Sequence, residues 1–397
     1  MKKESLVKIL VSLMQNPFSC PLFPQLLSKK GFNQLLKMAQ LNKATTFLSH
    51  FLDCQKCRSK LPSSSFEKLT NIYTTCLAQQ MMGEKEKKSL GKIFNQKQLK
   101  VVLLKDFSSY PKLYSGKIFI TGDIDLLVKK NGLQKVEELI KKDGYSLREN
   151  LILKNPLNKK TFLYQEKSFF KKGKVPSPYL DLHLQIAIPS IGEFRPISET
   201  VVKSLTDEVF KHSRKRKDHF FEPEIEYFLT FLIVHYFSSD LCTCLRNLYD
   251  IIALAKLYEK QIDWQKFWRL TQRHDLQKTA LFFLLLGSRV FKLSLPLSFQ
   301  NQIKIPFYLK ALTAKKSLES IAIFPPNWKW HNKTPALEKL FKEDFFFKAF
   351  LTEDVNLSRL MRPQIIFFFL SSVLKLTLFK FDDFFQSPTK TFFISKK

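Results

Sequence analysis

The chain has 397 residues, of which 45% are hydrophobic, and a net charge of +30 from 65 Lys and Arg against 35 Asp and Glu. This length allows two or three domains with a sizeable core, and the hydrophobic fraction excludes a disordered or fibrous protein. Only 10 glycines are present, too few for the many tight turns of an all-β protein.

The positive charge would attract a polyanion such as nucleic acid or an anionic membrane surface. The lysines, however, are scattered along the whole chain, and the one dense basic run is Arg-Lys-Arg-Lys at residues 214–217. We expect this run to lie in a solvated loop between helices. We therefore attribute the charge mainly to a lysine-rich composition, with an anionic partner as the alternative.

Six cysteines do not amount to a disulfide framework in a chain of this length. Cys54 and Cys57, together with Cys242 and Cys244, could supply four thiolates to zinc, but we expect ordinary helix cysteines because both pairs lie in or beside apolar helical stretches. No apolar run reaches the ~20 residues of a membrane-spanning helix, and we expect no signal peptide. These features predict a soluble, cytoplasmic protein.

Residues 1–97 are expected to form an N-terminal helical segment. Apolar residues recur with helical spacing, first over residues 6–13 and then over residues 33–51 and 66–82. A Pro-Ser-Ser-Ser stretch at residues 62–65 separates the last two helices.

The pattern changes to that of an α/β unit over residues 98–192. A continuous apolar run at residues 101–104 is typical of a strand buried on both faces, and residues 118–120 and 124–128 predict a second strand that continues or resumes. Asn131 is expected to open a helix with Gln134 as its capping-box partner, and Gly144 to end it.

Two further β elements are expected before the chain becomes helical again. Residues 162–170 suggest a hairpin, and residues 179–188 alternate well enough for a strand. From about residue 198 the helical period returns, and residues 193–300 are expected to form a helical bundle. Residues 301–397, which follow, are expected to be a C-terminal helical extension.

Asp123 and Asp125 are the strongest candidates for a functional site. Alternate residues of a strand point to the same face, so both carboxylates would project together while Ile124 turns into the core. Two adjacent carboxylates repel each other unless a cation joins them, and divalent metals accept oxygen ligands. Gly122, directly before the pair, would let a ligand approach the backbone closely.

Asp181 is the best candidate for a third carboxylate. It lies at the start of another predicted strand between apolar residues, and His183 shares its face. In two-metal phosphoryl chemistry, carboxylates hold metals on a triphosphate while another group activates the attacking hydroxyl. A pair of surface aspartates at a turn is the alternative, because an Asp-x-Asp pair alone is common.

The segment Gly-Asp-Ile-Asp-Leu-Leu-Val at residues 122–128 resembles the metal-binding signature of the DNA polymerase beta-like nucleotidyltransferase superfamily. More narrowly, it is similar to a branch of uncharacterised nucleotidyltransferases, in which a strand ending in Leu-Lys-Gly precedes the signature and an Asp-Leu-His segment follows it. Residues 102–105 and 181–183 match these two elements, and the later helices with His235 and the Arg246/Asp250 pair are similar too. The likeness covers roughly residues 30–300.

The resemblance implies an α+β fold with a mixed-sheet nucleotidyltransferase core, flanked by N-terminal helices and a C-terminal helical bundle. It also implies transfer of a nucleoside monophosphate from a nucleoside triphosphate, with ATP expected, to a hydroxyl of an acceptor. Two Mg²⁺ ions are expected. The implied catalytic residues and metal ligands are Asp123, Asp125 and Asp181, and the implied nucleotide-binding residues are Lys105, Gly122 and His183.

Two positions depart from the family pattern. Asp106 stands where the family has Gly and adds a repelling charge, and Phe119 stands where it often has Arg; Lys117 could substitute for that cation. These departures motivate one alternative, a catalytically degenerate binding protein of the same fold. The net charge motivates another, an RNA-binding or RNA-modifying protein. The acceptor could be a small molecule, a protein or RNA.

His235, Arg246 and Asp250 carry two interpretations. They could line the nucleotide or acceptor cleft, or they could make satisfied polar contacts between packed helices, and we favour the second.

Overall fold

The computed structural model describes residues 3–15, 29–53, 61–105, 123–154, 162–172, 178–187, 197–239 and 245–292. The predictions for the helical extension at residues 301–397, for a strand at residues 118–120 and for the two cysteine pairs lie outside these ranges. Within the described ranges, no helix combines the length and the apolarity needed to cross a membrane.

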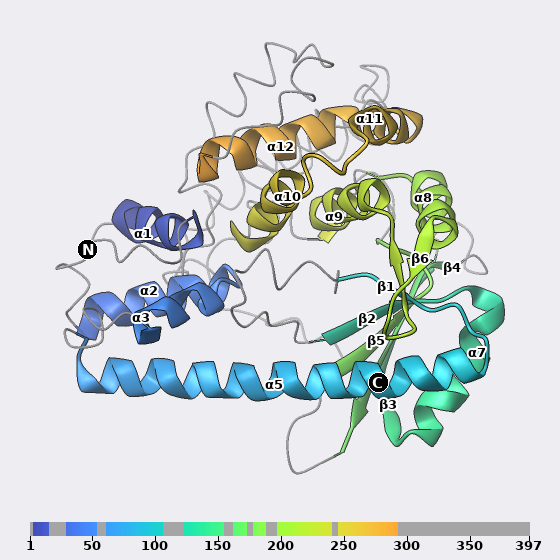
Figure 1. The fold of residues 1–397 in the computed structure, drawn as a ribbon, viewed down its shortest axis with the longest axis horizontal. Coiled ribbons are helices and arrows are strands. Elements are labelled where there is room, and N and C mark those ends of the chain that lie inside the picture. The colour runs from blue at the N-terminus through green and yellow to red at the C-terminus, as the bar shows by residue number, and fades with distance from the viewer. Residues whose placement is uncertain are drawn as a thin grey trace, which may run out of the picture.

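The N-terminal segment is helical, as predicted. Its elements are α1 (Lys3–Gln15), α2 (Lys29–Leu41), a 3-10 turn η2 (Thr45–Ser49), the short α3 (His50–Asp53) and α5 (Ser63–Gln96). Helix α5 has 34 residues and continues well past the predicted end near residue 82. Its first turns pack Leu69 against the other N-terminal helices, whereas Leu90 and Phe94 pack beneath the sheet. Helix α5 therefore runs from the N-terminal helices to the sheet (Figure 1).

Seven strands of the described residues form one mixed sheet in the order β3-β4-β5-β2-β1-β7-β6. The strands are β1 (Val102–Leu103), β2 (Asp123–Leu127), β3 (Tyr145–Lys154), β4 (Phe162–Lys171), β5 (Tyr179–His183), β6 (Ser213–Lys215) and β7 (Phe221–Pro223). Strand β2 pairs parallel with β5 and antiparallel with β1, and β5 pairs antiparallel with β4. This arrangement confirms the predicted α+β class with a mixed sheet.

Two predictions about β structure are wrong in detail. Residues 162–170 belong to the single strand β4, which forms a hairpin with β3, a strand that the sequence pattern did not predict. The basic residues Arg214 and Lys215 lie in β6, not in a loop, and the β6–β7 hairpin extends the sheet beside β1. Charged residues are tolerated there because β6 is an edge strand whose side chains reach solvent.

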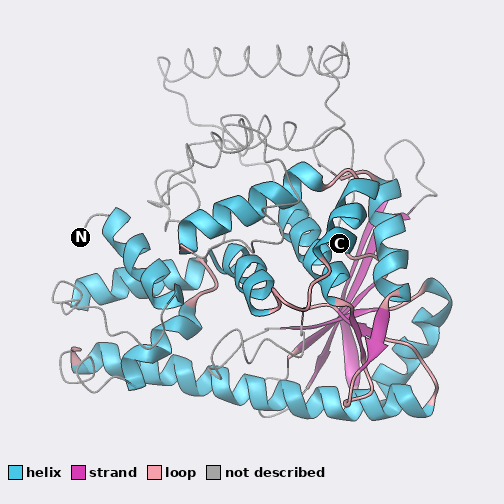
Figure 2. Ribbon diagram, turned by 45° about the horizontal axis from the view of Figure 1, so that its top comes forward, coloured by secondary structure: helices cyan, strands magenta, loops and turns pink. Residues whose placement is uncertain are grey.

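The two faces of the sheet are covered by separate apolar cores. In Figure 2 the strands lie between the long helix α5 and the helices of the bundle. On one face, Ile124 and Leu126 pack with α5 and with α7 (Lys130–Lys142). On the other face, Leu127 joins the core of the helical bundle. This alternation along β2 is what the period of a strand dictates.

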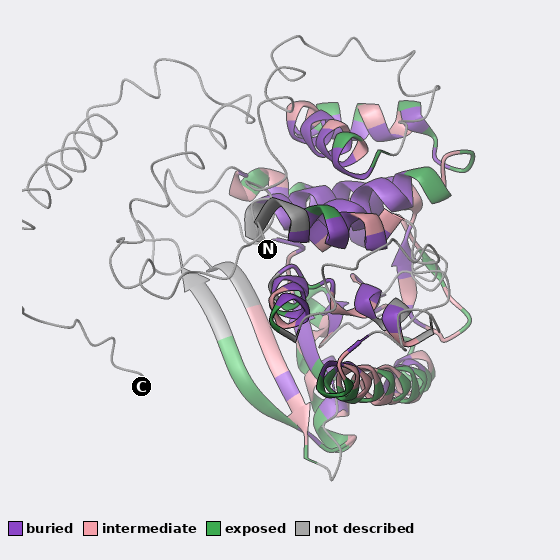
Figure 3. Cartoon of the chain, turned by 90° about the vertical axis from the view of Figure 1, so that its left-hand side faces the viewer, coloured by how far each residue is buried: buried purple, intermediate pink, exposed green. Residues whose placement is uncertain are grey.

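The bundle consists of α8 (Glu199–Lys211), α9 (Ile225–Ser239), α10 (Leu245–Leu257), α11 (Trp264–Arg273) and α12 (Gln277–Phe291). Buried residues follow these helices, whereas residues 146–150 of β3 are exposed and residues 166–171 of β4 are mostly intermediate in burial (Figure 3). Residues of α1 and α2 share this bundle core, so the N-terminal helices and the bundle pack as one apolar body.

Helix ends are set by local side chains at several points. Ser198 and Asp263 accept hydrogen bonds from the backbone N–H groups of Val201 and Lys266 and so cap α8 and α11. Gly144 follows α7 with φ +93°, a conformation that glycine adopts without strain, as predicted.

The predicted capping box at the start of α7 is wrong. The N-cap residue is Lys129, with no side-chain cap bond, and Gln134 instead donates to Glu138 one turn along the helix at 3.1 Å. Asn131 and Gln134 lie inside the first turns of the helix, so their side chains are not placed to cap it.

Candidate metal and nucleotide site

The parallel pairing of β2 with β5 brings the predicted carboxylates together. Asp125 lies directly opposite Asp181, and Asp123 is two residues earlier on the same face of β2. Each of the three residues offers a carboxylate oxygen, and these oxygens all lie within 4.8 Å of one another. The face they share is the one covered by the helical bundle, because Leu127, on the same side of β2, belongs to that core.

The carboxylates are progressively buried from the mouth of the site inward. Asp123, the first residue of β2, is partly exposed, whereas Asp181 is 8% and Asp125 only 3% exposed. Burial of a carboxylate costs free energy unless cations or hydrogen-bond donors compensate it. The surroundings of Asp125 and Asp181 therefore decide what the site can bind.

Asp125 receives two cationic donors on one oxygen. Lys105 Nζ and His183 Nε2 each lie 2.9 Å from Asp125 Oδ1. Burial alone would raise the pKa of Asp125, but the Lys105 charge and the His183 hydrogen bond hold it well below its usual range. Burial likewise opposes a charged Lys105, yet the Asp125 and Asp123 carboxylates raise the pKa of that amine.

The second oxygen of Asp125 has no such compensation. Asp125 Oδ2 is buried and has no hydrogen-bond partner among the described residues. A buried acceptor left bare costs about 1–3 kcal/mol, more for a charged group. An oxygen of this kind, with the carboxylates of Asp123 and Asp181 beside it, fits a divalent cation of the hard, oxygen-binding type.

The other two aspartates have raised pKa values. Burial, together with the negative charge of Asp125, raises the pKa of Asp123. Burial raises the pKa of Asp181 to about 6, although a hydrogen bond from Ser168 opposes the shift. A bound cation would favour the ionised forms of both, because a metal ligand must be deprotonated.

Strand β4 supplies two side chains to the site that sequence analysis missed. Ser168 Oγ donates to Asp181 Oδ1, and Glu166 Oε2 lies 3.4 Å from His183 Nδ1. The alternation of Glu166 and Ser168 with Lys167 and Phe169 could have indicated that Glu166 and Ser168 share one face of a strand. The predicted hairpin over residues 162–170 obscured this alternation. A strand that carries polar and charged residues among its apolar ones is difficult to recognise from hydrophobic pattern alone.

Lys43 is a third missed residue. It follows α2 in a turn with φ +53°, and its positive charge opposes the rise in the pKa of Asp123. The bundle holds this turn in place, because the buried side chain of Asn42 accepts a hydrogen bond from the backbone N–H of Leu245 in α10 at 3.2 Å. The N-terminal helices therefore bring a cation toward the exposed end of the carboxylate cluster.

His235, Arg246 and Asp250 make contacts typical of packed helices. Arg246 Nε lies 3.8 Å from Asp250 Oδ2, and the Tyr236 hydroxyl donates to the same oxygen at 3.2 Å. His235 Nδ1 lies 3.4 Å from the carbonyl oxygen of Ile186. Burial, with the nearby charges of Lys105 and His183, lowers the pKa of His235 to about 3, so this ring is neutral.

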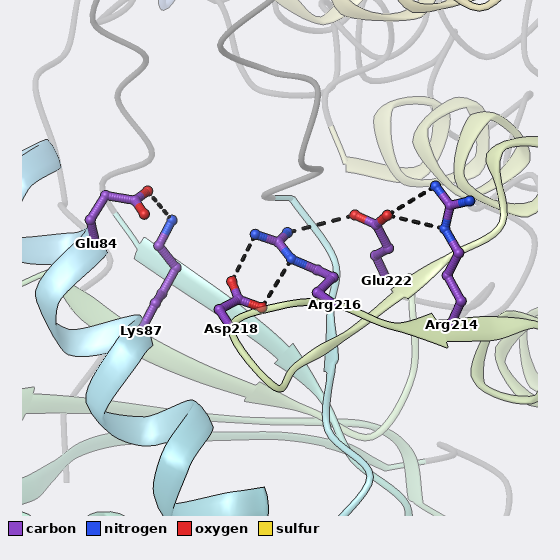
Figure 4. A network of polar contacts seen from close by, with 6 residues as sticks. All are labelled: Glu84, Lys87, Arg214, Arg216, Asp218 and Glu222. Carbon is purple, nitrogen blue, oxygen red and sulfur yellow. Dashed lines mark hydrogen bonds and ion pairs between the residues drawn. The ribbon is translucent and has the colours of Figure 1, made fainter.

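The two arginines of the basic run at residues 214–217 pair with acidic residues of their own hairpin (Figure 4). Arg216 pairs with Asp218 at 2.8 Å and Arg214 with Glu222 at 3.1 Å. The hairpin packs closely on α5, where a Cβ at Gly91 would lie 2.0 Å from the Asp218 carbonyl oxygen. These contacts give the two arginines a structural role, which weakens the argument for RNA binding through this run.

Several predicted positions cannot be placed. Gly122, together with Asp106, Lys117 and Phe119, lies outside the described residues. Lys105, which could reach a phosphate, is bonded to Asp125 in this structure, and His183 likewise contacts Asp125 and Glu166.

A mixed sheet with three carboxylates on adjacent strands defines a nucleotidyltransferase-like core. A family model described as uncharacterised nucleotidyltransferase matches residues 28–292. Because this match covers more than half of the chain, the protein belongs to that family. No curated protein matches the chain. The matched region begins at α2 and ends with α12, so it includes the turn with Lys43 and the whole bundle.

Proposed function

We propose that the protein is a metal-dependent nucleotidyltransferase that moves a nucleoside monophosphate from a nucleoside triphosphate to a hydroxyl of an acceptor. The observation that carries this proposal is the convergence of Asp123, Asp125 and Asp181 around a buried carboxylate oxygen that has no hydrogen-bond partner among the described residues. The family membership supports nucleotidyl transfer as the chemistry.

Magnesium is the metal that we propose for this site, because the available donors are carboxylate oxygens. Asp123, Asp125 and Asp181 would hold it, and three carboxylates suffice to share two ions. When bound, magnesium neutralises negative charge on the reacting phosphates. Lys105 and His183 hold the Asp125 carboxylate in place from the protein side.

The reaction is an in-line attack of the acceptor hydroxyl on the α-phosphate. A new P–O bond forms to the acceptor, the bond to pyrophosphate breaks, and Asp181 accepts the hydroxyl proton. Lys43, at the exposed end of the cluster, is proposed to contribute to binding of the triphosphate.

We further propose ATP as the nucleotide, on the family resemblance alone, and the cytoplasm as the compartment, to which the low cysteine count lends support. The division into a core at residues 98–192 and a bundle at residues 193–300 is also proposed. The sheet supports a core in the first range, although strands β6 and β7 of the second range complete that sheet.

A labelled-nucleotide assay tests the proposal. The full chain is incubated with magnesium, a cell extract as acceptor pool and each of the four nucleoside triphosphates, labelled on the α-phosphate. We expect label to enter an acceptor with the wild type and not with Asp123→Ala, whereas Asp143→Ala, an aspartate bonded to Lys171 away from the site, should transfer normally. Transfer by Asp123→Ala at the wild-type level would refute the proposed site.

A binding protein that has lost turnover is the second candidate, and Asp106 and Phe119 favour it because both reduce the positive charge available to phosphates. It predicts magnesium-dependent nucleotide binding without label transfer from any of the four nucleotides. Transfer that Asp123→Ala abolishes would exclude this candidate.

A further inference from the structure

Strand β4 supports the proposed site without supplying a metal ligand. It pairs antiparallel with β5, so that Ser168 lies opposite Asp181 and Glu166 lies opposite His183. Both β4 side chains point to the face that carries the three aspartates, whereas Lys167 points to the other face and pairs with Glu137 of α7. Each buried polar residue of β5 thus has a partner on β4.

His183 is held between two carboxylates. Its Nε2 lies 2.9 Å from Asp125 Oδ1 on one side, and its Nδ1 lies 3.4 Å from Glu166 Oε2 on the other. The ring is buried, so its two nitrogens have no alternative contact with bulk water. With a carboxylate facing each nitrogen, Nδ1–H points to Glu166 while Nε2–H donates to Asp125, which is the arrangement of a doubly protonated ring. The ring cannot turn without losing one of these two contacts.

The orientation of Asp125 follows from this arrangement. His183 and Lys105 both donate to Oδ1, which leaves Oδ2 as the oxygen available to a cation. If the imidazole turned away, Oδ1 would keep only the Lys105 contact and the carboxylate could rotate.

We propose that Glu166 is a positioning residue of the metal site, which acts through His183 to fix the Asp125 carboxylate and thereby sets the metal affinity. This inference rests on the proposed function, since it assumes that the aspartates bind a divalent cation. Residues that contact a metal ligand directly, as His183 contacts Asp125, typically change metal affinity by about 10–100-fold when they are removed. Glu166 acts one contact further out, so the lower end of this range is expected.

The proposal is tested by binding of Mn²⁺ to the full chain without nucleotide, measured by loss of the free-ion electron paramagnetic resonance signal. Glu166→Ala is expected to weaken Mn²⁺ binding by about tenfold. Glu166→Gln keeps an acceptor oxygen of the same reach and is expected to recover most of that loss. The matched control is Glu137→Ala, which removes a carboxylate that contacts β4 on the opposite face and should leave the affinity unchanged.

Binding by Glu166→Ala within twofold of the wild type would overturn the inference, as would Glu166→Gln binding no better than Glu166→Ala. If Glu166→Ala does not fold, Glu166→Met, which keeps the side-chain length without an acceptor, is judged by the same criterion. The failure of the proposed function is distinguishable: it appears as wild-type protein that binds no Mn²⁺, or as binding that survives in Asp125→Asn.

Discussion

Replacing Lys105 with methionine removes the cation of the Lys105–Asp125 ion pair while keeping much of the side-chain volume. The pair joins the end of β1 to the middle of β2 and has an Nζ–Oδ1 distance of 2.9 Å. The Asp125 side chain is 1% exposed and the Lys105 side chain 26%. The variant would therefore leave a buried carboxylate with His183 as its remaining donor.

The expected loss follows from this geometry. Removal of one partner from a fully buried ion pair costs about 3–5 kcal/mol, because the other charge stays buried without compensation. Two features reduce the cost here: Lys105 is about one-quarter exposed and thus partly screened, and His183 still donates to the same oxygen. We expect the metal-free variant to lose about 2–3 kcal/mol of unfolding free energy.

Urea unfolding in the presence of a chelator measures this loss. Lys171→Met is the matched control, because the Lys171 side chain is 28% exposed and also bonds two carboxylates. Those carboxylates are less buried than Asp125, at 12% and 20% exposed. We therefore expect Lys171→Met to lose only about 1 kcal/mol of unfolding free energy. Added Mg²⁺ should restore part of the stability of Lys105→Met, since a cation can replace the missing charge. A loss no larger than that of Lys171→Met would refute the reasoning.

Three further predictions concern other parts of the molecule. In the folded protein the pKa of His235 is about 3, below the unfolded value near 6.5, so the unfolded state binds more protons between these two pH values. The free energy of unfolding therefore falls as the pH decreases through this window, by up to about 1.4 kcal/mol per pH unit. His235→Gln should reduce that slope in chelator-containing buffer, and an unchanged slope would contradict the lowered pKa of His235. Gly91→Ala should destabilise the protein by about 2–3 kcal/mol because the new Cβ would lie 2.0 Å from the Asp218 carbonyl oxygen. The control Gly132→Ala should be neutral or slightly stabilising, because a Cβ at residue 132 has no neighbouring atom within 4 Å. Equal melting temperatures for both variants would argue against the close contact at Gly91. Lys43→Gln should weaken magnesium–nucleotide binding by about 3–10-fold with unchanged thermal stability, and an unaffected dissociation constant in calorimetry would exclude a role for this cation in phosphate binding.

The shared face of Asp123 and Asp125 could be predicted from sequence because it depends only on the local period of a strand. The same holds for the helices, where apolar spacing located α9, α11 and α12 to within a few residues. Asp181 was identifiable because a carboxylate between apolar residues of a strand needs a compensating partner. These are properties of short stretches of chain.

The contacts between strands could not be predicted in the same way. The register that sets Asp125 opposite Asp181 depends on the connection between β2 and β5, and Lys105 meets Asp125 only after β1 has paired with β2. Residues 145–154 were not recognised as a strand because the exposed residues 146–150 of this edge strand are all polar apart from Leu147. Local pattern contains no information about which distant strand lies alongside.

Helix α5 illustrates the opposite limit, in which tertiary packing overrides local preference. Glycine weakens a helix interior, so Gly83 and Gly91 make a helix of 34 residues unlikely on propensity alone. At Gly91 the missing side chain is what allows the β6–β7 hairpin to approach the helix backbone. The hairpin contact thus explains a residue that sequence analysis would treat as a break.

The most direct test of the central claim is calorimetric titration of ATP, with and without magnesium, into the wild type and into the variant with Asp123→Ala and Asp125→Ala combined. The account predicts that the wild type binds ATP only when magnesium is present and that the double variant loses this binding. Equal binding by both proteins, or wild-type binding that does not depend on magnesium, would contradict a metal–nucleotide site at these aspartates.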